Sequence, residues 1–152
     1  MDLVKEIVLL QRRVDGLIKP EVGRWVDWMP TVTQSGAVAV TVNYARYVVM
    51  ANMVVGQARL TVTGSGTAGN AIIIGGMPVL DQPVRNGSNV DIMGSMLVLD
   101  SGLAFYHGAL VAVGGADWRG IAHNLANYIG ITPSFGLVAT DVIGIEFAYE
   151  RA

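Results

Sequence analysis

The sequence predicts an all-β protein: a jelly-roll-like β-sandwich head that follows a short N-terminal coiled-coil helix. Apolar residues recur at helical spacing over the first 19 residues, and after residue 20 they recur at every second position. Turns rich in glycine, serine and asparagine then separate many short apolar segments, and no second helical pattern appears. We therefore divide the chain into a helical stalk, residues 1–19, and a β-sandwich head domain, residues 20–152.

The predicted stalk carries a heptad seam. Its apolar residues follow one another at intervals of four, three, four and three, which is the a/d spacing of a coiled coil. Lys19-Pro20 ends the helix, because proline disfavours helical geometry in the residue before it. A helix packed on its own head is the alternative, and Val8 and Leu9, which lie off the seam, fit that arrangement. The predicted oligomerisation residues are Leu3, Ile7, Leu10, Val14 and Leu17.

The head shows the period of two that is typical of half-buried strands. Residues 37–44, 54–62 and 142–150 alternate in this way, and segments 70–74, 96–99, 103–113 and 118–123 are further candidate strands. Residues 20–36 are expected to form a collar between stalk and head. The sets expected to share a face are Val38, Val40, Val42 and Tyr44; Ala58, Leu60 and Val62; and Ile143, Ile145, Phe147 and Tyr149.

The composition points to self-association and away from several other partners. Only 14% of residues are charged, against about 25% in a typical soluble domain, so part of the surface is expected to face another subunit. The net charge of -2 supplies no basic field for nucleic acid. The charge-free stretches 60–80 and 120–140 are interrupted by polar residues, glycine and proline, so we expect no membrane insertion.

No residue pattern predicts a catalytic, cofactor or metal site. Residues 64–69 match the glycine spacing of a dinucleotide loop, but an apolar, strand-like segment follows them, so we predict a hairpin loop. His107 and His123 lack metal-ligand spacing, and a triad of Ser101, either histidine and Asp117 has no supporting motif. We therefore predict that the protein is not an enzyme and uses no cofactor.

Aromatic residues offer a possible platform for sugar rings. For any single one of them, packing in the core or at a subunit interface is the favoured interpretation. The Asn86-Gly87-Ser88 sequence is interpreted as a turn. The aromatic candidates are Trp25, Trp28, Trp118, Tyr44, Tyr47 and Tyr106.

The order of these parts resembles a known family. The heptad stalk runs into residues 23–31, which hold a Trp-x-x-x-x-Pro-Thr stretch, and then into residues 32–36. Residues 66–71 precede an apolar segment and Pro78, and the chain closes on an alternating strand ending at residue 151. Over residues 20–151 this arrangement resembles the C-terminal head domains of tailed-bacteriophage minor tail and fibre proteins.

The resemblance implies a homotrimeric β-sandwich displayed on a virion surface, without cofactor or catalytic residues. Such heads usually end a longer chain, so here the stalk or collar is expected to dock to other virion proteins, on the tail or on the capsid. The heptad pattern alone favours two strands, whereas the resemblance implies three. The outward partner is expected to be a host surface, such as a glycan. A small carbohydrate-binding, lectin-like module is the alternative function.

Overall fold

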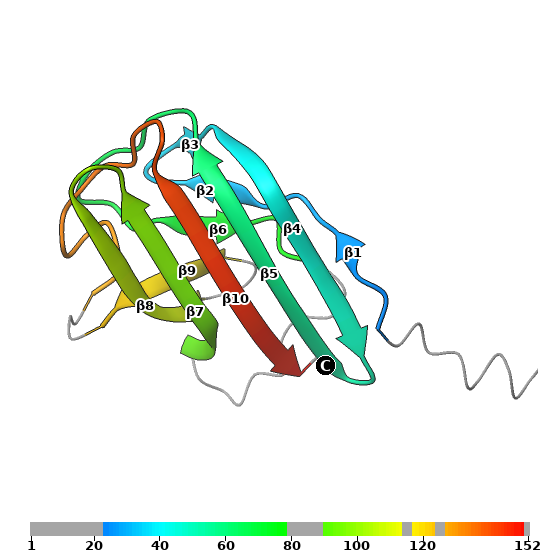
Figure 1. Ribbon diagram of the computed structural model, residues 1–152. Coiled ribbons are helices and arrows are strands. Elements are labelled where there is room, and N and C mark those ends of the chain that lie inside the picture. Colours follow the sequence, from blue (N-terminus) through cyan, green and yellow to red (C-terminus); the bar gives the residue numbers. More distant parts are fainter. Residues whose placement is uncertain (1–22, 79–89, 114–116, 124–126, 151–152) are drawn as a thin grey trace, which may run out of the picture.

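The computed structural model describes residues 23–78, 90–113, 117–123 and 127–150 (Figure 1). The predicted stalk, with Leu3, Ile7, Leu10, Val14 and Leu17, lies outside these residues, as does the expected boundary at Lys19-Pro20. The described part of the chain contains strands and no helix, so it holds no helix able to cross a membrane.

The strands form one antiparallel sheet. Its order is β1-β4-β5-β10-β7-β8-β9-β6-β2-β3, so the C-terminal strand β10 lies between β5 and β7. The strands are β1 (Val26–Asp27), β2 (Thr31–Thr33), β3 (Ala37–Val38), β4 (Val40–Met50), β5 (Met53–Val62), β6 (Ile73–Gly75), β7 (Val90–Asp100), β8 (Ala104–Val113), β9 (Asp117–Ala122) and β10 (Val142–Glu150).

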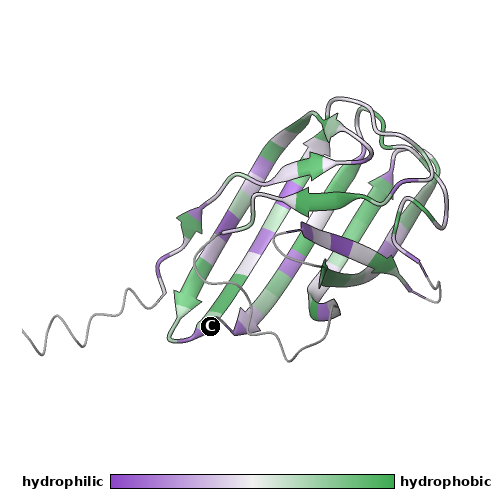
Figure 2. Ribbon diagram, turned by 180° about the vertical axis from the view of Figure 1, so that it is seen from behind, coloured by the Kyte–Doolittle hydropathy of each residue, from purple (hydrophilic) through white to green (hydrophobic). Residues whose placement is uncertain are grey.

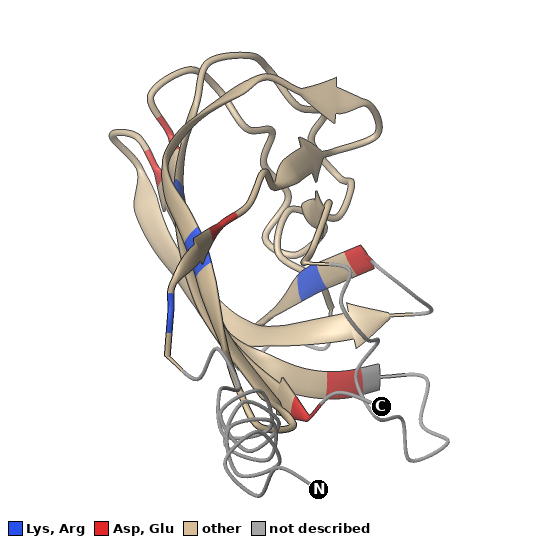
Figure 3. Ribbon diagram, turned by 90° about the vertical axis from the view of Figure 1, so that its right-hand side faces the viewer, with Lys and Arg blue, Asp and Glu red and all other residues tan. Residues whose placement is uncertain are grey.

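The sheet is strongly curled. Strands β3 and β4 stand near opposite ends of the sheet order, yet a single residue, Ala39, joins them. The carbonyl of Ala39 accepts hydrogen bonds from the amides of Thr63 (2.8 Å) and Gly64 (3.0 Å), just beyond the end of β5. The short strands β6, β2 and β3 therefore lie opposite the long strands, as Figures 1 and 3 show. This confirms the all-β prediction as a curled antiparallel sheet.

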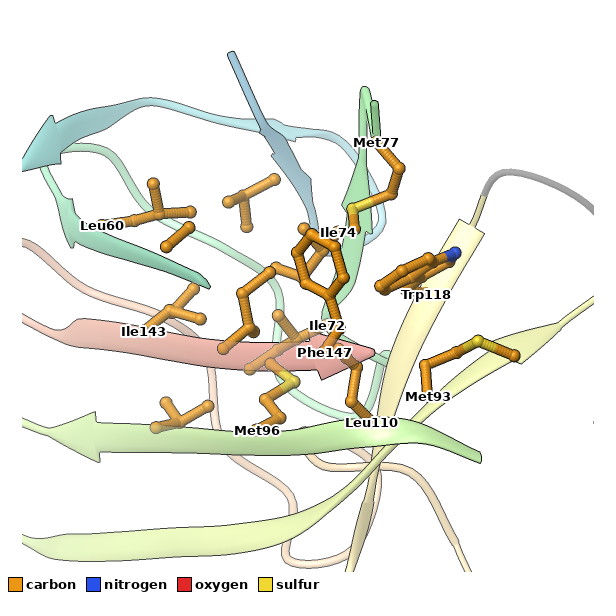
Figure 4. Close-up of a cluster of buried hydrophobic side chains, with 14 of the residues drawn as sticks. Leu60, Ile72, Ile74, Met77, Met93, Met96, Leu110, Trp118, Ile143 and Phe147 are labelled. Atoms are coloured by element: carbon orange, nitrogen blue, oxygen red, sulfur yellow. The ribbon is translucent and has the colours of Figure 1, made fainter. Parts of the chain in front are cut away.

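The core lies on the concave side of the curl. The predicted alternation is confirmed in β5 and β10, whose inward side chains are all buried. Figure 2 shows the alternation of apolar and polar residues along the long strands, and Figure 4 shows how side chains from both parts of the sheet meet. The members from β5 and β10 are Ala58, Leu60, Val62, Ile143, Ile145, Phe147 and Tyr149, and Val32, Ile72 and Ile74 come from the opposite side.

Phe147 forms the aromatic centre of this core. It pairs with Gly56 on β5 and with Gly94 on β7, so both neighbouring strands present a glycine to it. A Cβ atom at Gly56 would collide with the Phe147 ring, so the absent side chain provides the space that the ring occupies. Trp118 and Trp28 meet the same ring edge-to-face, with centroid distances of 5.0 and 6.1 Å. Such pairs each add about 1 kcal/mol beyond their buried area.

The strand predicted over residues 37–44 is wrong in its bounds and in one face. It breaks at Ala39 into β3 and β4, and β4 continues to Met50. A bulge between Val42 and Tyr44 inserts one residue and shifts the alternation by one. Tyr44 therefore points outward and is 45% exposed, instead of sharing the inner face with Val42. Beyond the bulge Ala45 is buried instead.

The predicted strands 70–74, 96–99, 103–113 and 118–123 overlap observed strands, but their bounds differ. The segments 96–99 and 103–113 belong to β7 and β8, and β7 begins six residues earlier than predicted, at Val90. Residues 23–36, the described part of the expected collar, take part in the sheet and the core of the head. Within them β1 pairs with β4, β2 pairs with β6, and Trp28 is buried in the core.

Candidate binding surface

The glycine-rich loop that precedes β6 has a packing role. Gln34 is only 1% exposed, and its Nε2 donates hydrogen bonds to the carbonyls of Asn70 (3.1 Å) and Phe135 (2.8 Å). Its Oε1 accepts a hydrogen bond from the amide of Leu137 at 2.9 Å. A Cβ atom at Gly66 would collide with this Oε1. Residues 32–36 and 66–71, both parts of the family-like motif, therefore meet at one buried amide.

The two histidines lie next to each other but form no metal centre. The backbone amide of His123 donates a hydrogen bond to the carbonyl of His107 at 3.1 Å, and both side chains are exposed. Among the described residues, no group of three or more histidines, cysteines or carboxylates is placed to hold a metal ion.

The possible triad is not assembled. Ser101 lies in the turn that joins β7 to β8, whereas Asp117 begins β9 opposite Val113. His107 is six positions from Val113 along β8, and a strand rises about 3.3 Å per residue, so roughly 20 Å separates His107 from Asp117 along the sheet. His123 lies at the opposite end of β9 from Asp117. None of these residues can act together as nucleophile, base and orienting acid.

A buried carboxylate joins two connections at one end of the sheet. Asp141 is fully buried, and its two carboxylate oxygens accept hydrogen bonds from the amides of Ser101 and Val138, both at 2.8 Å. Asp100 is its buried neighbour. Burial raises the pKa of Asp100, and the charge of Asp141 raises this pKa further. The two hydrogen bonds join the β7–β8 turn to the connection that precedes β10, and the described residues place no third ligand beside the pair.

The side of the long strands that faces away from the core carries a groove, which we call the outer groove. One row of cross-strand neighbours crosses it: Tyr44 on β4, Arg59 on β5, Gly144 on β10, Leu97 on β7 and His107 on β8. Gly144 forms the floor, since a Cβ atom there would meet nothing within 4 Å. This part of the groove encloses about 450 Å³ and is also lined by Phe105 and Glu146.

A second hollow continues the outer groove along β10. It encloses about 580 Å³ between Trp25, Gln57, Gly94 and Ala148, and it shares Ser95 and Glu146 with the first. The two hollows therefore adjoin over a floor of small residues.

Charged residues along this groove differ in their partners. The guanidinium of Arg46 lies 4.9 Å from the Trp25 ring centre and 5.9 Å from that of Tyr44. With the Gln57 amide oriented so that its oxygen faces Arg46, that oxygen accepts hydrogen bonds from Nε and Nη2 of Arg46 at 2.9 and 2.8 Å. Arg59 and Glu146 have no ion-pair partner within the part of the chain that the structure describes. Figure 3 shows how sparse charged residues are along the ribbon.

The aromatic candidates divide between core and surface. Trp28, Trp118 and Tyr47 are buried in the core, and Tyr106 stacks on Phe135 with ring centres 4.5 Å apart. Trp25 and Tyr44 line the outer groove. Sequence reasoning missed Phe105, which is 71% exposed at the rim. The alternation within segment 103–113 indicates that Phe105 and Tyr106 lie on opposite faces of the strand. It does not indicate which of these faces is turned to the core.

The head has two distinct ends. The described chain starts at Gly23 and stops at Glu150. Both lie at one end, which we call the near end, together with the β4–β5 hairpin (Figure 1). The other end, which we call the far end, holds the β5–β6 connection, the β7–β8 turn and residues 130–141. The sequence offers segments 64–70, 85–89 and 114–117, which are rich in turn residues, as candidate binding loops. The first lies at the far end, the second lies outside the described residues, and Asp117, the described part of the third, lies at the near end. Leu103 and Val138 are exposed at the far end.

Comparisons of this chain with protein-family models, with curated proteins and with solved structures find no match. The function is therefore inferred from the residues of the chain and from the motif resemblance described above.

Proposed function

We propose that this protein is a surface component of a tailed-bacteriophage virion. In this proposal it is a homotrimer whose N-terminal stalk docks to other virion proteins, on the tail or the capsid. The β head faces outward, where it binds the host surface, such as a glycan, or stabilises the particle. The proposal includes no catalysis, cofactor or nucleic acid.

The observation that carries this proposal is the polarity of the head. The chain enters the sheet at one end, and connections carrying the exposed Leu103 and Val138 lie at the other. Met50, Met53 and Ile92 are also exposed toward the entry end, where docking to the particle would cover them. Leu103 is 82% exposed on the β7–β8 turn, although Asp141 holds that turn firmly through the Ser101 amide. Exposed apolar residues on a rigid scaffold are typical of recognition sites. A head attached at its near end would present these residues outward.

The buried amide of Gln34 also supports the resemblance. The short motifs shared with phage heads are far apart in sequence, yet the structure brings two of them into direct hydrogen-bond contact. Such motifs therefore have a common structural reason to occur together. As part of the proposal, we interpret the curled sheet as a jelly-roll-like sandwich, with β6, β2 and β3 in the layer opposite the long strands.

The proposal is tested by changing the far end. Leu103→Ser combined with Val138→Ser should reduce adsorption of particles to host cells, while the melting temperature stays within about 2 °C, because exposed side chains contribute little to stability. Met50→Ser, which changes an exposed apolar residue at the near end, is the matched control. Deleting residues 1–19 should release the protein from particles.

Two results would separate the alternatives within this proposal. Unchanged adsorption of the far-end variant, with the stalk deletion still releasing the protein, would assign a particle-stabilising role instead of host binding. Continued particle association without residues 1–19 would contradict docking through the stalk.

A carbohydrate-binding module is the second candidate function. The observation that favours it is the exposure of Tyr44 and Phe105 on either side of the Gly144 floor, because sugar rings stack on aromatic faces. A glycan array probed with the full chain and with Tyr44→Ala tests it. Binding that disappears in the variant would support this function, and no binding to any glycan would reject it.

A further inference from the structure

We propose that the outer face of β4, β5, β10 and β7 packs against other copies of this chain. The copies would surround an axis on that side of the sheet, and the outer groove would be filled by a neighbour's side chains. The number of copies, three, is taken from the proposed function, and the inference rests on it in that respect. The face itself is inferred from three observations on the head.

The first observation is the side from which the chain enters the sheet. Trp25 comes two residues after the first described residue and lines the outer groove beside Gln57 and Ser95. It is held there by the Arg46 guanidinium. The side chain nearest the point where the described chain enters the sheet is therefore turned to the outer face. Copies joined through the residues that precede Gly23 would bring these Trp25-lined ends of their outer grooves close to a common axis.

The second observation is the apolar character of this face. Tyr44, Leu97 and Phe105 are all substantially exposed there, in a chain with only 14% charged residues. Between them lies the open floor at Gly144, where an added Cβ atom would meet nothing within 4 Å among the described residues. Burying these three side chains between copies would be favourable, because apolar surface would leave water.

The third observation is an unpaired cation beside an unpaired anion. Arg46 is occupied by Trp25 and Gln57, whereas Arg59 and Glu146 have no ion-pair partner in the described part of the chain. In a closed ring of copies, each molecule presents one patch to a different patch on its neighbour. Arg59 of one copy would then face Glu146 of the next. A neutral saccharide in the groove would use the same aromatic rims, but it would leave Arg59 and Glu146 without ionic partners.

Gly144→Leu tests the proposal without disturbing the fold, because the new side chain would extend into open space. The full-length variant should keep its melting temperature when dilute, while self-association weakens by about tenfold or more, since the neighbour's space is filled. Light scattering across a concentration series measures this, with the native assembly expected at three times the 16.1 kDa chain mass. Gly36→Leu is the control, because Gly36 also has open space around it but lies between β2 and β3.

Thiol labelling tests the contact on the outer face directly. The chain has no cysteine, so a single introduced thiol is unique. Leu97→Cys should react slowly with a maleimide in the native background and rapidly when combined with Gly144→Leu. Leu103→Cys, at the exposed far end, should react rapidly in both backgrounds.

The charge pair gives an independent test. Arg59→Glu and Glu146→Arg should each weaken association, and the double variant should recover it. Mixing the two single variants should produce mixed assemblies, which a pair formed only within one chain would not produce.

Four results would overturn the proposal: a monomeric native chain, unchanged association of Gly144→Leu, equally rapid labelling of Leu97→Cys in both backgrounds, or unchanged association of the charge variants. Loss of glycan binding by Gly144→Leu with association unchanged would identify a saccharide as the occupant instead. The proposed function fails separately: it is contradicted if the protein stays on particles after residues 1–19 are deleted.

Discussion

At the scale of single residues, buried polar groups hold the loops of this head. Gln34 bonds three backbone groups from two distant connections, and Asp141 bonds two more. Removing either side chain would leave buried amides or carbonyls unsatisfied, at about 1–3 kcal/mol each. The sequence could not have predicted these bonds, because Gln34 is separated from its partners by 36 to 103 residues. Of the residues around the Gln34 side chain, only Gly66 belongs to a pattern that can be recognised in the sequence, the glycine-rich segment 64–69.

Asp100→Asn should make the protein more stable at neutral pH. Burial and the neighbouring Asp141 raise the pKa of Asp100 above its ordinary 3.8. The folded state then holds this proton more tightly than the unfolded state, so the free energy of unfolding falls as pH rises from 3.8 through the raised pKa. Asparagine has no proton to lose. The variant should melt at a higher temperature than the native chain at pH 7, and this advantage should disappear at pH 3.

Melting curves at the two pH values measure the effect of Asp100. Asp27→Asn is the control, since it removes an exposed carboxylate from β1. An equal difference between Asp100→Asn and the native chain at both pH values would show that ionisation of Asp100 does not destabilise the fold.

At the scale of strands, prediction succeeded where the alternation is long and unbroken. β10 was predicted over its full length, and β5 to within one residue, because each has one apolar face. β4 was mispredicted in one face because its bulge shifts the register, and the residues around Val42 carry no sign of it. β1, β2 and β3 are two or three residues long, too short to show a period. The residues of the outer groove are brought together by the register between neighbouring strands. This register cannot be predicted from a single sequence.

Gly56→Val should destabilise the head. Its side chain would enter the space of the Phe147 ring, and overpacking of this kind costs about 1–3 kcal/mol. Gly144→Ala is the matched control on the neighbouring strand, where the added methyl group meets nothing within 4 Å. Its stability should stay within about 0.5 kcal/mol of the native value. Denaturant unfolding of both variants measures the difference, and equal stabilities would mean that Phe147 moves aside without cost.

At the scale of the whole molecule, the curl decides what the surface can do. The sheet closes on itself through Ala39, and the described residues surround one continuous core. Its concave side is therefore filled, which leaves the outer face and the two ends for partners. The near end receives the chain, and the far end carries exposed apolar residues. Self-association on the outer face and recognition at the far end would thus use separate surfaces.

That separation predicts the behaviour of a chain that begins at Glu21. Strands β1 to β10 all lie beyond this point, so the shortened protein should keep a β-type circular dichroism spectrum and a cooperative melting transition. It should lose most helical signal, because the heptad seam lies within residues 1–19. Its association should weaken without vanishing, since the outer face would still pack between copies. An unfolded product would show that the N-terminal residues belong to the core of the head, and the division into stalk and head would then be wrong.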